Sequence, residues 1–478
     1  MSLNALHREW FSNVRGDVLA GMTVALALIP EAIAFSLIAG VDPMVGLYAS
    51  FCIAVVIAFA GGRPGMISAA TGSMALVMVV LVRDFGLQYL LAATLLTGVI
   101  QVALGVLRVG RFITFVPYSV VLGFVNALAI LIFLAQVPFI VNVPWVVYAL
   151  VALTIAIVKF LPRYTKAVPS SLAAIVVVTL IAISLRLDVQ TVGDLGTITR
   201  SLPAFFLPAV PLTIETLLII LPYAATLTVV GLLESLLTAS IVDEMTGTRS
   251  DRDREVRGQG LANCVAGLFG GMAGCAMIGQ SVINVKSGGS GRLSSLVAGV
   301  FLIVLIIVFG DIVAQIPMAA LVGVMIMVAV GTFDWQSLRD LVKIPRSDAV
   351  IMLGTVAIVV VTHDLAKGVI AGVVMAALVF GWKMSRISAI SAVREDGVKV
   401  YTVSGQLFFG TMAAFVDLFD YDDDPSEVRI DLGRSHVWDQ SAVAAITRVR
   451  ERYRQQGKSV YITGLDSESQ RTLDVGFS

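Results

Sequence analysis

The sequence has little charge, little cysteine and little histidine, and each shortage excludes a class of protein. Only 14% of its 478 residues are charged, whereas about 25% are charged in an ordinary soluble domain. Basic and acidic residues balance at 33 each, so no basic excess is available to bind nucleic acid. This composition excludes a disordered chain, a collagen-like chain and a disulfide scaffold, and it argues against a purely water-soluble enzyme.

The three cysteines and three histidines also lack the spacing of a chemical site. Cys52, Cys264 and Cys275 lie in apolar segments without close spacing, which argues against a disulfide framework and against a zinc site. The histidines are isolated from one another along the chain. We therefore expect no bound metal, no cofactor and no enzymatic activity.

Long apolar runs are what the chain has instead. Hydrophobic residues make up 58% of the sequence, and its mean hydropathy is +0.92. A run of about 20 apolar residues spans a bilayer as a helix. We therefore predict an α-helical polytopic membrane protein with about fourteen transmembrane segments, at 18–39, 44–60, 66–82, 87–107, 113–136, 144–161, 168–185, 214–240, 258–273, 275–290, 294–310, 317–333, 348–362 and 366–382.

Two of these segments, 66–82 and 275–290, are short and rich in glycine, serine and threonine. We expect half-helices there, each completed by extended chain. Both are third in a set of seven segments, at about 17–187 and about 213–386, and because seven is odd the second set is inverted, which gives a 7+7 inverted repeat. Matching interruptions of this kind are typical of a transporter's binding site, although glycine and serine can also serve close helix packing alone.

The distribution of charge divides the chain into two domains. From residue 392 onward there are 10 basic and 14 acidic residues, so we predict a membrane domain over 1–391 and a soluble domain over 392–478. Strands near 398–403, 428–432 and 459–462, with a helix over 440–455, indicate a small α/β domain. Most membrane-domain lysines and arginines fall on one side, which predicts a multi-pass protein of the inner (plasma) membrane with both termini in the cytoplasm.

Two carboxylates lie well inside apolar runs. Glu31 follows Pro30, and Glu234 lies within the run 229–237. A charged side chain at the bilayer centre costs on the order of 3 kcal/mol or more and is rarely kept without a role. Burial disfavours the ionised form, so each carboxyl is a candidate to carry a proton near neutral pH. The alternative is a neutral acid that hydrogen-bonds helix backbone freed by Pro30 and is purely structural.

The N-termini of the two half-helices are candidates to bind an anion. They offer unpaired backbone N–H groups and positive dipole ends, and two such ends facing each other near the midplane hold a small anion without a fixed cation. Thr71, Ser73, Cys275 and Gln280 are candidates for further polar contacts. Phe35 is a candidate for an apolar wall or, equally, for an ordinary core aromatic.

Several stretches carry a family resemblance, and together they extend over nearly the whole chain. They are Ile29–Phe35, Gly46–Tyr48, Thr71–Gly72, Glu234–Ala239, Asp243–Gly247, Glu255–Asn263 and Val282–Gly289, with Phe408–Gly410 and Asp439–Ala442 in the tail. In combination they resemble the sulfate permease (SulP) family of anion transporters with a C-terminal STAS domain. The chain is identified as a prokaryotic member of this family.

The resemblance implies a core domain and a gate domain, an anion site between the third and tenth segments, and transport by movement of the core against the gate within a homodimer. Carried onto this chain, it implies a substrate site made of Glu31, Phe35, Ser73, Met74, Cys275, Ala276, Met277, Ile278 and Gln280. It gives Glu234 the position of the ion-coupling residue or counter-charge, with Glu31 as a second ion-coupling candidate.

The sequence departs from the family pattern in ways that bear on coupling. Many relatives carry Arg where Gln280 stands and Gln where Glu31 stands, so this site is less positive. That disfavours simple chloride exchange and favours an anion that enters with a cation, the simplest being a proton on Glu31 or Glu234. In the STAS motif Gln440 replaces a serine, which argues against control by phosphorylation there, and the tail ends compactly at Gly476–Ser478, where a last helix is expected.

We therefore expect a secondary active transporter that couples protons to symport of a small anion (a dicarboxylate, sulfate or bicarbonate). Carboxylates are slightly favoured, because no arginine is available to bind sulfate in a bidentate manner. The alternatives are a sodium-coupled anion symporter, for instance of bicarbonate, an anion exchanger and an anion channel. The expected partners are the anion, the coupling proton or sodium ion, the lipid bilayer and a second copy of the chain.

Overall fold

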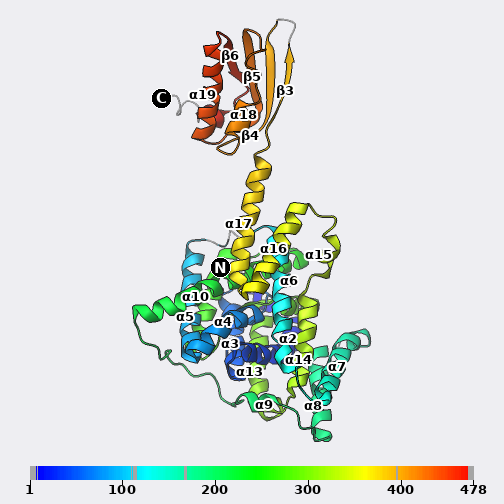
Figure 1. Cartoon of the computed structure of the whole chain (residues 1–478). Coiled ribbons are helices and arrows are strands. Elements are labelled where there is room, and N and C mark those ends of the chain that lie inside the picture. The colour runs from blue at the N-terminus through cyan, green and yellow to red at the C-terminus, as the bar shows by residue number, and fades with distance from the viewer. Residues whose placement is uncertain are drawn as a thin grey trace. The chain divides into compact units, whose positions relative to one another are not determined.

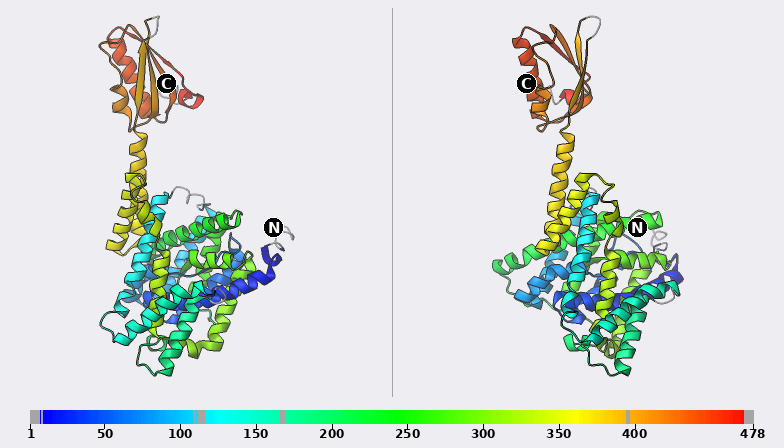
Figure 2. Two further views of the ribbon diagram at one scale, coloured as in Figure 1. Left: turned by 90° about the vertical axis from the view of Figure 1, so that its right-hand side faces the viewer. Right: turned by 45° about the vertical axis from the view of Figure 1, so that its right-hand side comes forward.

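The computed structural model describes residues 7, 9–108, 110, 116–165, 169–393 and 397–471, and it divides into two units at Val373. The first unit is almost entirely helical, as Figures 1 and 2 show. Its principal helices are α2 (Val14–Ala39), α3 (Pro43–Ala60), α4 (Gly72–Phe85), α5 (Leu87–Val106), α6 (Tyr118–Leu134), α7 (Trp145–Phe160), α8 (Ser170–Ser184), α10 (Ile214–Thr246), α11 (Arg252–Leu268), α12 (Ile278–Lys286), α13 (Arg292–Ala314), α14 (Met318–Thr332) and α16 (Arg346–Thr362), followed by α17 (Leu365–Met384), which crosses the unit boundary.

Each predicted apolar segment overlaps one of these helices, so the α-helical polytopic fold is confirmed. Among the described residues, eight helices are long and apolar enough to cross a membrane. The short helices α9 (Val192–Leu195) and α15 (Trp335–Asp340) lie outside the predicted segments. The inverted relation of the two halves stays a prediction.

Local sequence signals set the helix ends. Asp42 accepts a hydrogen bond from the Met44 N–H, and Pro43 is the first residue of α3, which are common features of a helix start. Asp251 caps α11 in the same way. This helix begins at Arg252, earlier than the predicted segment 258–273, because its first turns carry charged residues that an apolar pattern does not register.

The helices of the first unit pack in two groups. In one group α13 packs against α2 and α3, while α11 packs against α3 and α5, and α10 packs against α4 and α5. In the other group α6 packs against α14 and α16, and α7 packs against α8 and α14. These groups correspond in their members to the core and gate that the family resemblance implies.

The second unit contains a four-stranded sheet with helices α18 (Met412–Val416) and α19 (Gln440–Gln455). The strand order is β3 (Ser388–Val393), β4 (Lys399–Leu407), β5 (Glu427–Val437) and β6 (Ser459–Thr463). The first pair is antiparallel, and the other two pairs are parallel.

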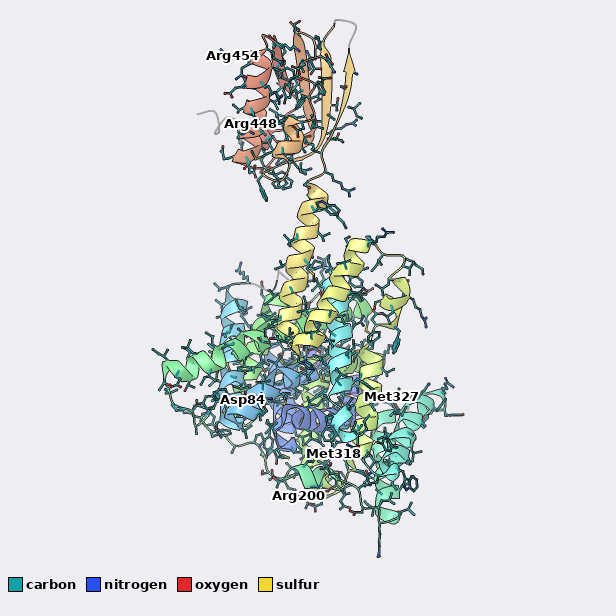
Figure 3. All side chains as sticks on the ribbon, in the orientation of Figure 1. Asp84, Arg200, Met318, Met327, Arg448 and Arg454 are labelled. Carbon is teal, nitrogen blue, oxygen red and sulfur yellow. The ribbon has the colours of Figure 1, made fainter. Side chains whose placement is uncertain are left out.

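The second unit has its own apolar core. Val403, Phe415, Ile430 and Ile446 are buried in it, while Arg448 and Arg454 lie on the exposed side of α19 (Figure 3). The predicted helix and the three predicted strands are present. A fourth strand, β3, comes before them in the chain and includes residue 391, the last residue of the predicted membrane domain. Residues 472–478, on which the expectation of a missing last helix falls, lie outside the described residues.

Candidate functional site

Two short strands hold the starts of α4 and α12 next to each other. β1 (Ser68–Ala70) pairs antiparallel with β2 (Gly274–Ala276), and Ala69 lies opposite Cys275. A side chain at Gly274 would overlap the carbonyl oxygen of Ala69, so only glycine permits this approach. The expected pair of half-helices, each preceded by extended chain, is therefore present.

Polar side chains of α11 support the strand pair from behind. The Asn263 side-chain amide donates to the Gly274 carbonyl at 3.1 Å and accepts from the Gly274 N–H at 2.9 Å. It also donates to Gln101 of α5 at 2.9 Å. Gln259 donates to the Ser68 hydroxyl at 2.7 Å. These buried bonds satisfy the polar groups that an interrupted helix exposes inside a membrane.

Neither half-helix is capped by a side chain. α4 begins at Gly72 and α12 at Ile278, and no side-chain hydrogen bond caps either start. The first backbone bond within each helix is donated by Ala75 and Ser281, so the N–H groups before them have no partner within their own helix. Free N–H groups at a positive dipole end are a ready binding site for an anion.

A cavity of about 110 Å³ lies at these two helix starts. On this scale it has room for several water molecules or one small polyatomic anion. Its walls are Glu31, Phe35, Thr71, Gly72, Ser73, Phe124, Val125, Leu128, Ile132, Glu234, Met277, Ile278, Gly279, Gln280, Val328 and Thr332. None of these lining residues is lysine or arginine, so the cavity wall carries no fixed positive charge.

Glu234 of α10 is in contact with both interrupted segments. The Ser73 hydroxyl donates to its Oε2 atom, and the Cys275 thiol donates to the same atom at 3.1 Å. Thr71 Oγ1 lies 3.1 Å from Ser73 Oγ and 3.2 Å from Cys275 Sγ. A change in the charge of this one carboxyl therefore acts on both half-helix starts.

Glu31 forms a second pair across the cavity. The Gln280 amide donates to Glu31 Oε1 at 2.7 Å, and the buried carbonyl oxygen of Gln280 has no hydrogen-bond partner among the described residues. Phe35 lines the same cavity, and its ring lies against Gly72, where a side-chain carbon would come within 2.8 Å of it. Both membrane carboxyls thus face the cavity, each with donors that stabilise it.

The structure brings together most of the residues expected at the site. Glu31, Phe35, Ser73, Glu234, Met277, Ile278 and Gln280 line the cavity. Cys275 does not line the cavity but contacts Glu234, which does. Met74 instead packs against α10 at Gly231, and Ala276 lies in a small apolar cluster with Met66 and Ala239, because successive residues of a strand and a helix start point in different directions.

The wall opposite the half-helices was not predicted from the sequence. Phe124, Leu128 and Ile132 come from α6, and Val328 and Thr332 come from α14. These residues stand in segments that are apolar on every side, so the pattern does not reveal which face meets a cavity. Only Thr332 is polar, and one threonine at a helix end carries no distinctive signal.

Comparison with known proteins gives family matches over most of the chain. The model of the sulfate permease family matches residues 14–145 and 141–355, and the model of the STAS domain matches residues 389–476. The chain is 57% identical over 468 residues to YbaR of Bacillus subtilis (strain 168), whose name describes a candidate sulfate transporter, and the match covers 98% of each chain. It is 29% identical over 525 residues to the bicarbonate transporter BicA of Picosynechococcus sp., covering 98% of this chain and 92% of the relative.

Solved structures are similar as well. The transmembrane domain of a cyanobacterial bicarbonate transporter, BicA, matches with a TM-score of 0.67 and 30% identity, covering 76% of this chain and 98% of that chain. The murine Slc26a9 anion transporter matches with a TM-score of 0.84 and 17% identity, covering 96% and 87%. The second likeness concerns the fold alone.

Proposed function

This chain belongs to the sulfate permease family of anion transporters, as its motifs predicted, and from that premise we propose that it takes up a small anion together with protons. It is a bacterial multi-pass membrane protein with a STAS domain, and its family consists of transporters rather than enzymes. The observation that carries the proposal is the contact of Glu234 with both half-helix starts at a cavity that has no lining cation.

The charges at the cavity set the condition for anion entry. Two unit charges of the same sign 4 Å apart repel by about 4 kcal/mol at the effective dielectric constant of 20 used for proteins. Glu31 and Glu234 both line the cavity, so in their ionised forms they oppose any anion held by the helix ends. Protonation of a carboxyl removes this repulsion, and the anion and the proton therefore enter together.

The donors around Glu234 favour a proton over a sodium ion. Sodium is a hard cation that prefers several oxygen ligands, whereas thiols suit softer metals. At Glu234 the Cys275 thiol occupies one of the neighbouring positions, where a sodium site would have an oxygen ligand. A proton requires only the carboxyl itself.

The substrate class we propose is a small carboxylate-type anion, such as a dicarboxylate or bicarbonate, ahead of sulfate. No lysine or arginine lines the cavity, so no guanidinium is available to bind a sulfate ion in a bidentate manner, and bicarbonate in addition brings only one negative charge. The relatives' names include both sulfate and bicarbonate. A proteoliposome screen that contains all three kinds of anion is therefore needed.

Alternating access follows from the two groups of helices. We propose that the group containing α4, α10 and α12 carries the anion past the group containing α6 and α14, in a homodimer in the inner membrane with both chain ends in the cytoplasm. The cavity lies between these groups, because its walls come from both. Relative movement of the groups exposes it first to one side and then to the other.

Uptake into proteoliposomes tests the proposal. The purified full chain is reconstituted, and uptake of labelled succinate, bicarbonate and sulfate is compared under an inward proton gradient, an inward sodium gradient and no gradient. We expect accumulation of at least one carboxylate only under the proton gradient, with loss of accumulation on addition of a protonophore. Accumulation that follows the sodium gradient and ignores pH would overturn proton coupling, and currents without accumulation would indicate a channel.

A further inference from the structure

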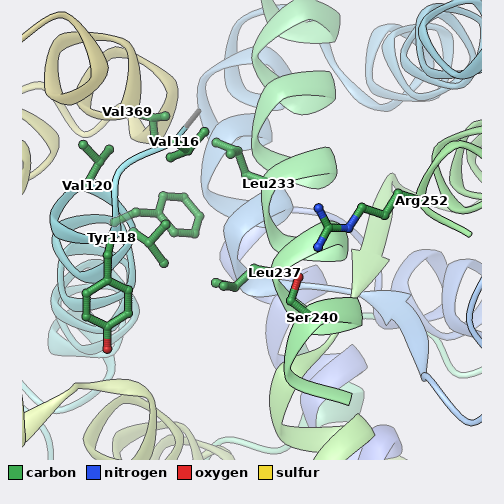
Figure 4. Close-up of a pocket in the computed structure, with 10 residues that line it drawn as sticks. Val116, Tyr118, Val120, Leu233, Leu237, Ser240, Arg252 and Val369 are labelled. Carbon is green, nitrogen blue, oxygen red and sulfur yellow. The ribbon is translucent and has the colours of Figure 1, made fainter. Parts of the chain in front are cut away.

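A second cavity lies next to the candidate anion site and shares one wall with it. Its volume is about 220 Å³, and it is lined by Val116, Tyr118, Val120, Val121, Phe124, Leu233, Leu237, Ser240, Arg252 and Val369 (Figure 4). Both cavities take walls from α6 and α10. They therefore follow each other along the same pair of helices.

Phe124 is the residue that lines both cavities. Along α6, Tyr118, Val120 and Val121 line the second cavity, whereas Val125, Leu128 and Ile132 line the first. Phe124 stands between these two sets and is only 4% exposed. Its side chain is the one of α6 that lines both spaces.

Along the facing helix α10, too, some residues line the second cavity and others line the first. Leu233, Leu237 and Ser240 recur at helical spacing and line the second cavity, as Figure 4 shows for their side chains opposite Val116 and Val120. Glu234 belongs to the first cavity. The apolar walls of the second cavity thus lead directly to the coupling carboxyl.

Arg252 is the one charged residue among those that line the second cavity. The guanidinium group points toward Leu237 and Ser240 in Figure 4. Among the described residues it has no ion pair.

Three carboxylates that are near Arg252 in the chain have other partners. Asp243 pairs with Arg63 at 3.3 Å, Asp251 accepts from the Arg254 N–H at 2.9 Å, and Asp253 accepts from the Gly110 N–H at 3.1 Å. None of these three carboxylates forms an ion pair with Arg252 among the described residues, so its guanidinium group is available to an anion in the cavity.

We propose that this second cavity is the vestibule through which the anion passes between the site and one side of the membrane, that Phe124 is the partition between the vestibule and the site, and that Arg252 attracts anions into the vestibule. The inference rests on the proposed function for the identity of the ligand, a small anion, and it adds a route and two residues to it. By the proposed topology the vestibule opens to the cytoplasm, since the basic residues 249–257 lie at this end of α10.

Elementary electrostatics explains why one arginine is sufficient at the mouth and why none is needed inside. A cleft with low-dielectric walls focuses the field of a single charge and raises the local concentration of counter-ions. A fixed cation beside Glu31 and Glu234 would hold the two carboxyls in their ionised forms. The fixed positive charge, Arg252, therefore lies in the vestibule, and in the site a proton on a carboxyl takes the place of a fixed cation.

Cysteine labelling tests the vestibule without any transport assay. Ser240→Cys is introduced into the full chain in lipid nanodiscs, and its modification by negatively and positively charged methanethiosulfonates is compared, with the wild-type cysteines as background. We expect the anionic reagent to react about tenfold faster, relative to a neutral reagent, than the cationic one. Arg252→Gln removes this preference, whereas Arg249→Gln, which removes an exposed charge from the loop before α11, leaves it intact.

Phe124 is tested with a cysteine behind the partition. Val125→Cys reacts slowly in the presence of Phe124, several-fold faster with Phe124→Ala and more slowly still with Phe124→Trp. Phe133→Ala on the same helix, at a side chain that is 42% exposed and lines neither cavity, leaves the rate unchanged. Opposite effects of Ala and Trp distinguish a partition from damage to the fold, which would move both variants in the same direction.

The outcomes separate this inference from the proposed function. Equal rates for the two charged reagents at Ser240→Cys, or a Val125→Cys rate that does not depend on residue 124, would overturn the vestibule even if proton-coupled uptake is observed. Charge-selective labelling in a protein that transports no anion would leave the vestibule in place and refute the proposed function. In a transporting protein, Arg252→Gln raises the KM for the anion from the vestibule side several-fold with little change in kcat, and Arg252→Lys restores it.

Discussion

At the scale of single residues, Glu234 has a position that no other acid in the described chain shares. Its Oε2 atom accepts from Ser73 of one half-helix and from Cys275 of the strand that leads to the other. Glu31, in contrast, is held by one donor, Gln280. A proton on Glu234 therefore affects both helix starts, whereas a proton on Glu31 affects one.

This difference predicts the behaviour of two matched variants. Glu234→Gln resembles the protonated acid but cannot release a proton, so we expect anion exchange to persist and accumulation driven by a pH gradient to fall to simple equilibration. Glu31→Gln should keep pH-driven accumulation. Counterflow and gradient-driven uptake in proteoliposomes measure the two activities, and Glu215→Gln, at an exposed glutamate in the first turn of α10, is the control. Full pH-driven accumulation by Glu234→Gln would remove this residue from the coupling scheme.

A second residue-scale prediction concerns the tyrosines of the STAS unit. Burial raises the pKa of the Tyr453 hydroxyl above its ordinary range, and its hydrogen bond to Asp424 raises it further; burial also raises the pKa of Tyr421 to about 12. The pKa of each tyrosine is therefore higher in the folded state than in the unfolded state. The contribution of these tyrosines to the free energy of unfolding is fully present below about pH 10, the ordinary pKa of tyrosine, and is lost as the pH rises above it.

The Tyr453→Phe variant tests the predicted direction of this pH dependence. The variant loses a hydrogen bond to a charged group, which contributes about 1.5–3 kcal/mol, so we expect lower stability at neutral pH and a difference from wild type that narrows above pH 10. Denaturant unfolding of the full chain in detergent, followed together with tyrosinate absorbance, provides the measurement. Tyr461→Phe, at an exposed side chain of β6, should have no such effect. A constant difference across the pH range would contradict the assignment.

At the scale of elements, glycines decide how closely α5 and α11 approach. A side-chain carbon at Gly98 would lie 2.5 Å from the Gly260 carbonyl oxygen and 2.5 Å from the Cys264 nitrogen. One at Gly260 would lie 2.5 Å from the Val102 nitrogen. Small residues of this kind allow helix backbones to touch in membranes, and here they hold α11, which supports the strand pair, against α5.

Gly98→Ala should therefore destabilise the membrane unit. Overpacking of a close contact costs about 1–3 kcal/mol, and the displaced α11 also carries Asn263, which bonds Gly274 beside the site. We expect a lower midpoint in thermal unfolding of the full chain and reduced transport. Gly331→Ala on α14, where a side chain would meet no atom within 4 Å, is the matched control and should be neutral or slightly stabilising. Equal midpoints for the two variants would contradict the close approach.

At the scale of the whole molecule, the two units have separate cores and separate contents. Both cavities, both half-helices and both membrane carboxyls lie in the first unit. The second unit has its own buried cluster, which includes Val403, Phe415 and Tyr453. The chemistry proposed for transport therefore needs no side chain of the second unit.

A chain that ends at Arg386 tests this division. We expect it to keep pH-driven uptake in proteoliposomes. Gel filtration and thermal unfolding in detergent establish that the shortened chain is folded. A folded, monodisperse truncated chain without any uptake would assign the STAS unit an essential part in transport. The same gel filtration measures the oligomeric state of both chains and so tests the homodimer, which remains a prediction.

The sequence by itself determined the class of the protein and the chemical type of its site. Long apolar runs require internally satisfied backbone in lipid, which leaves helices as the solution, and the glycine-rich interruptions at 66–82 and 275–290 marked where backbone is left free. Glu31 and Glu234 stood out because a carboxyl is costly in an apolar run. The motifs identified the family before any fold was known.

Only the tertiary structure decided which groups meet. It joined Glu234 to Ser73 and Cys275, directed Met74 and Ala276 away from the cavity, and supplied the wall of α6 that contains Phe124. The reason is physical: in a helix that is apolar on every side, lipid, a neighbouring helix and a cavity all accept the same residues. The distinction between them arises from packing between segments far apart in the chain, which periodicity along one segment does not record.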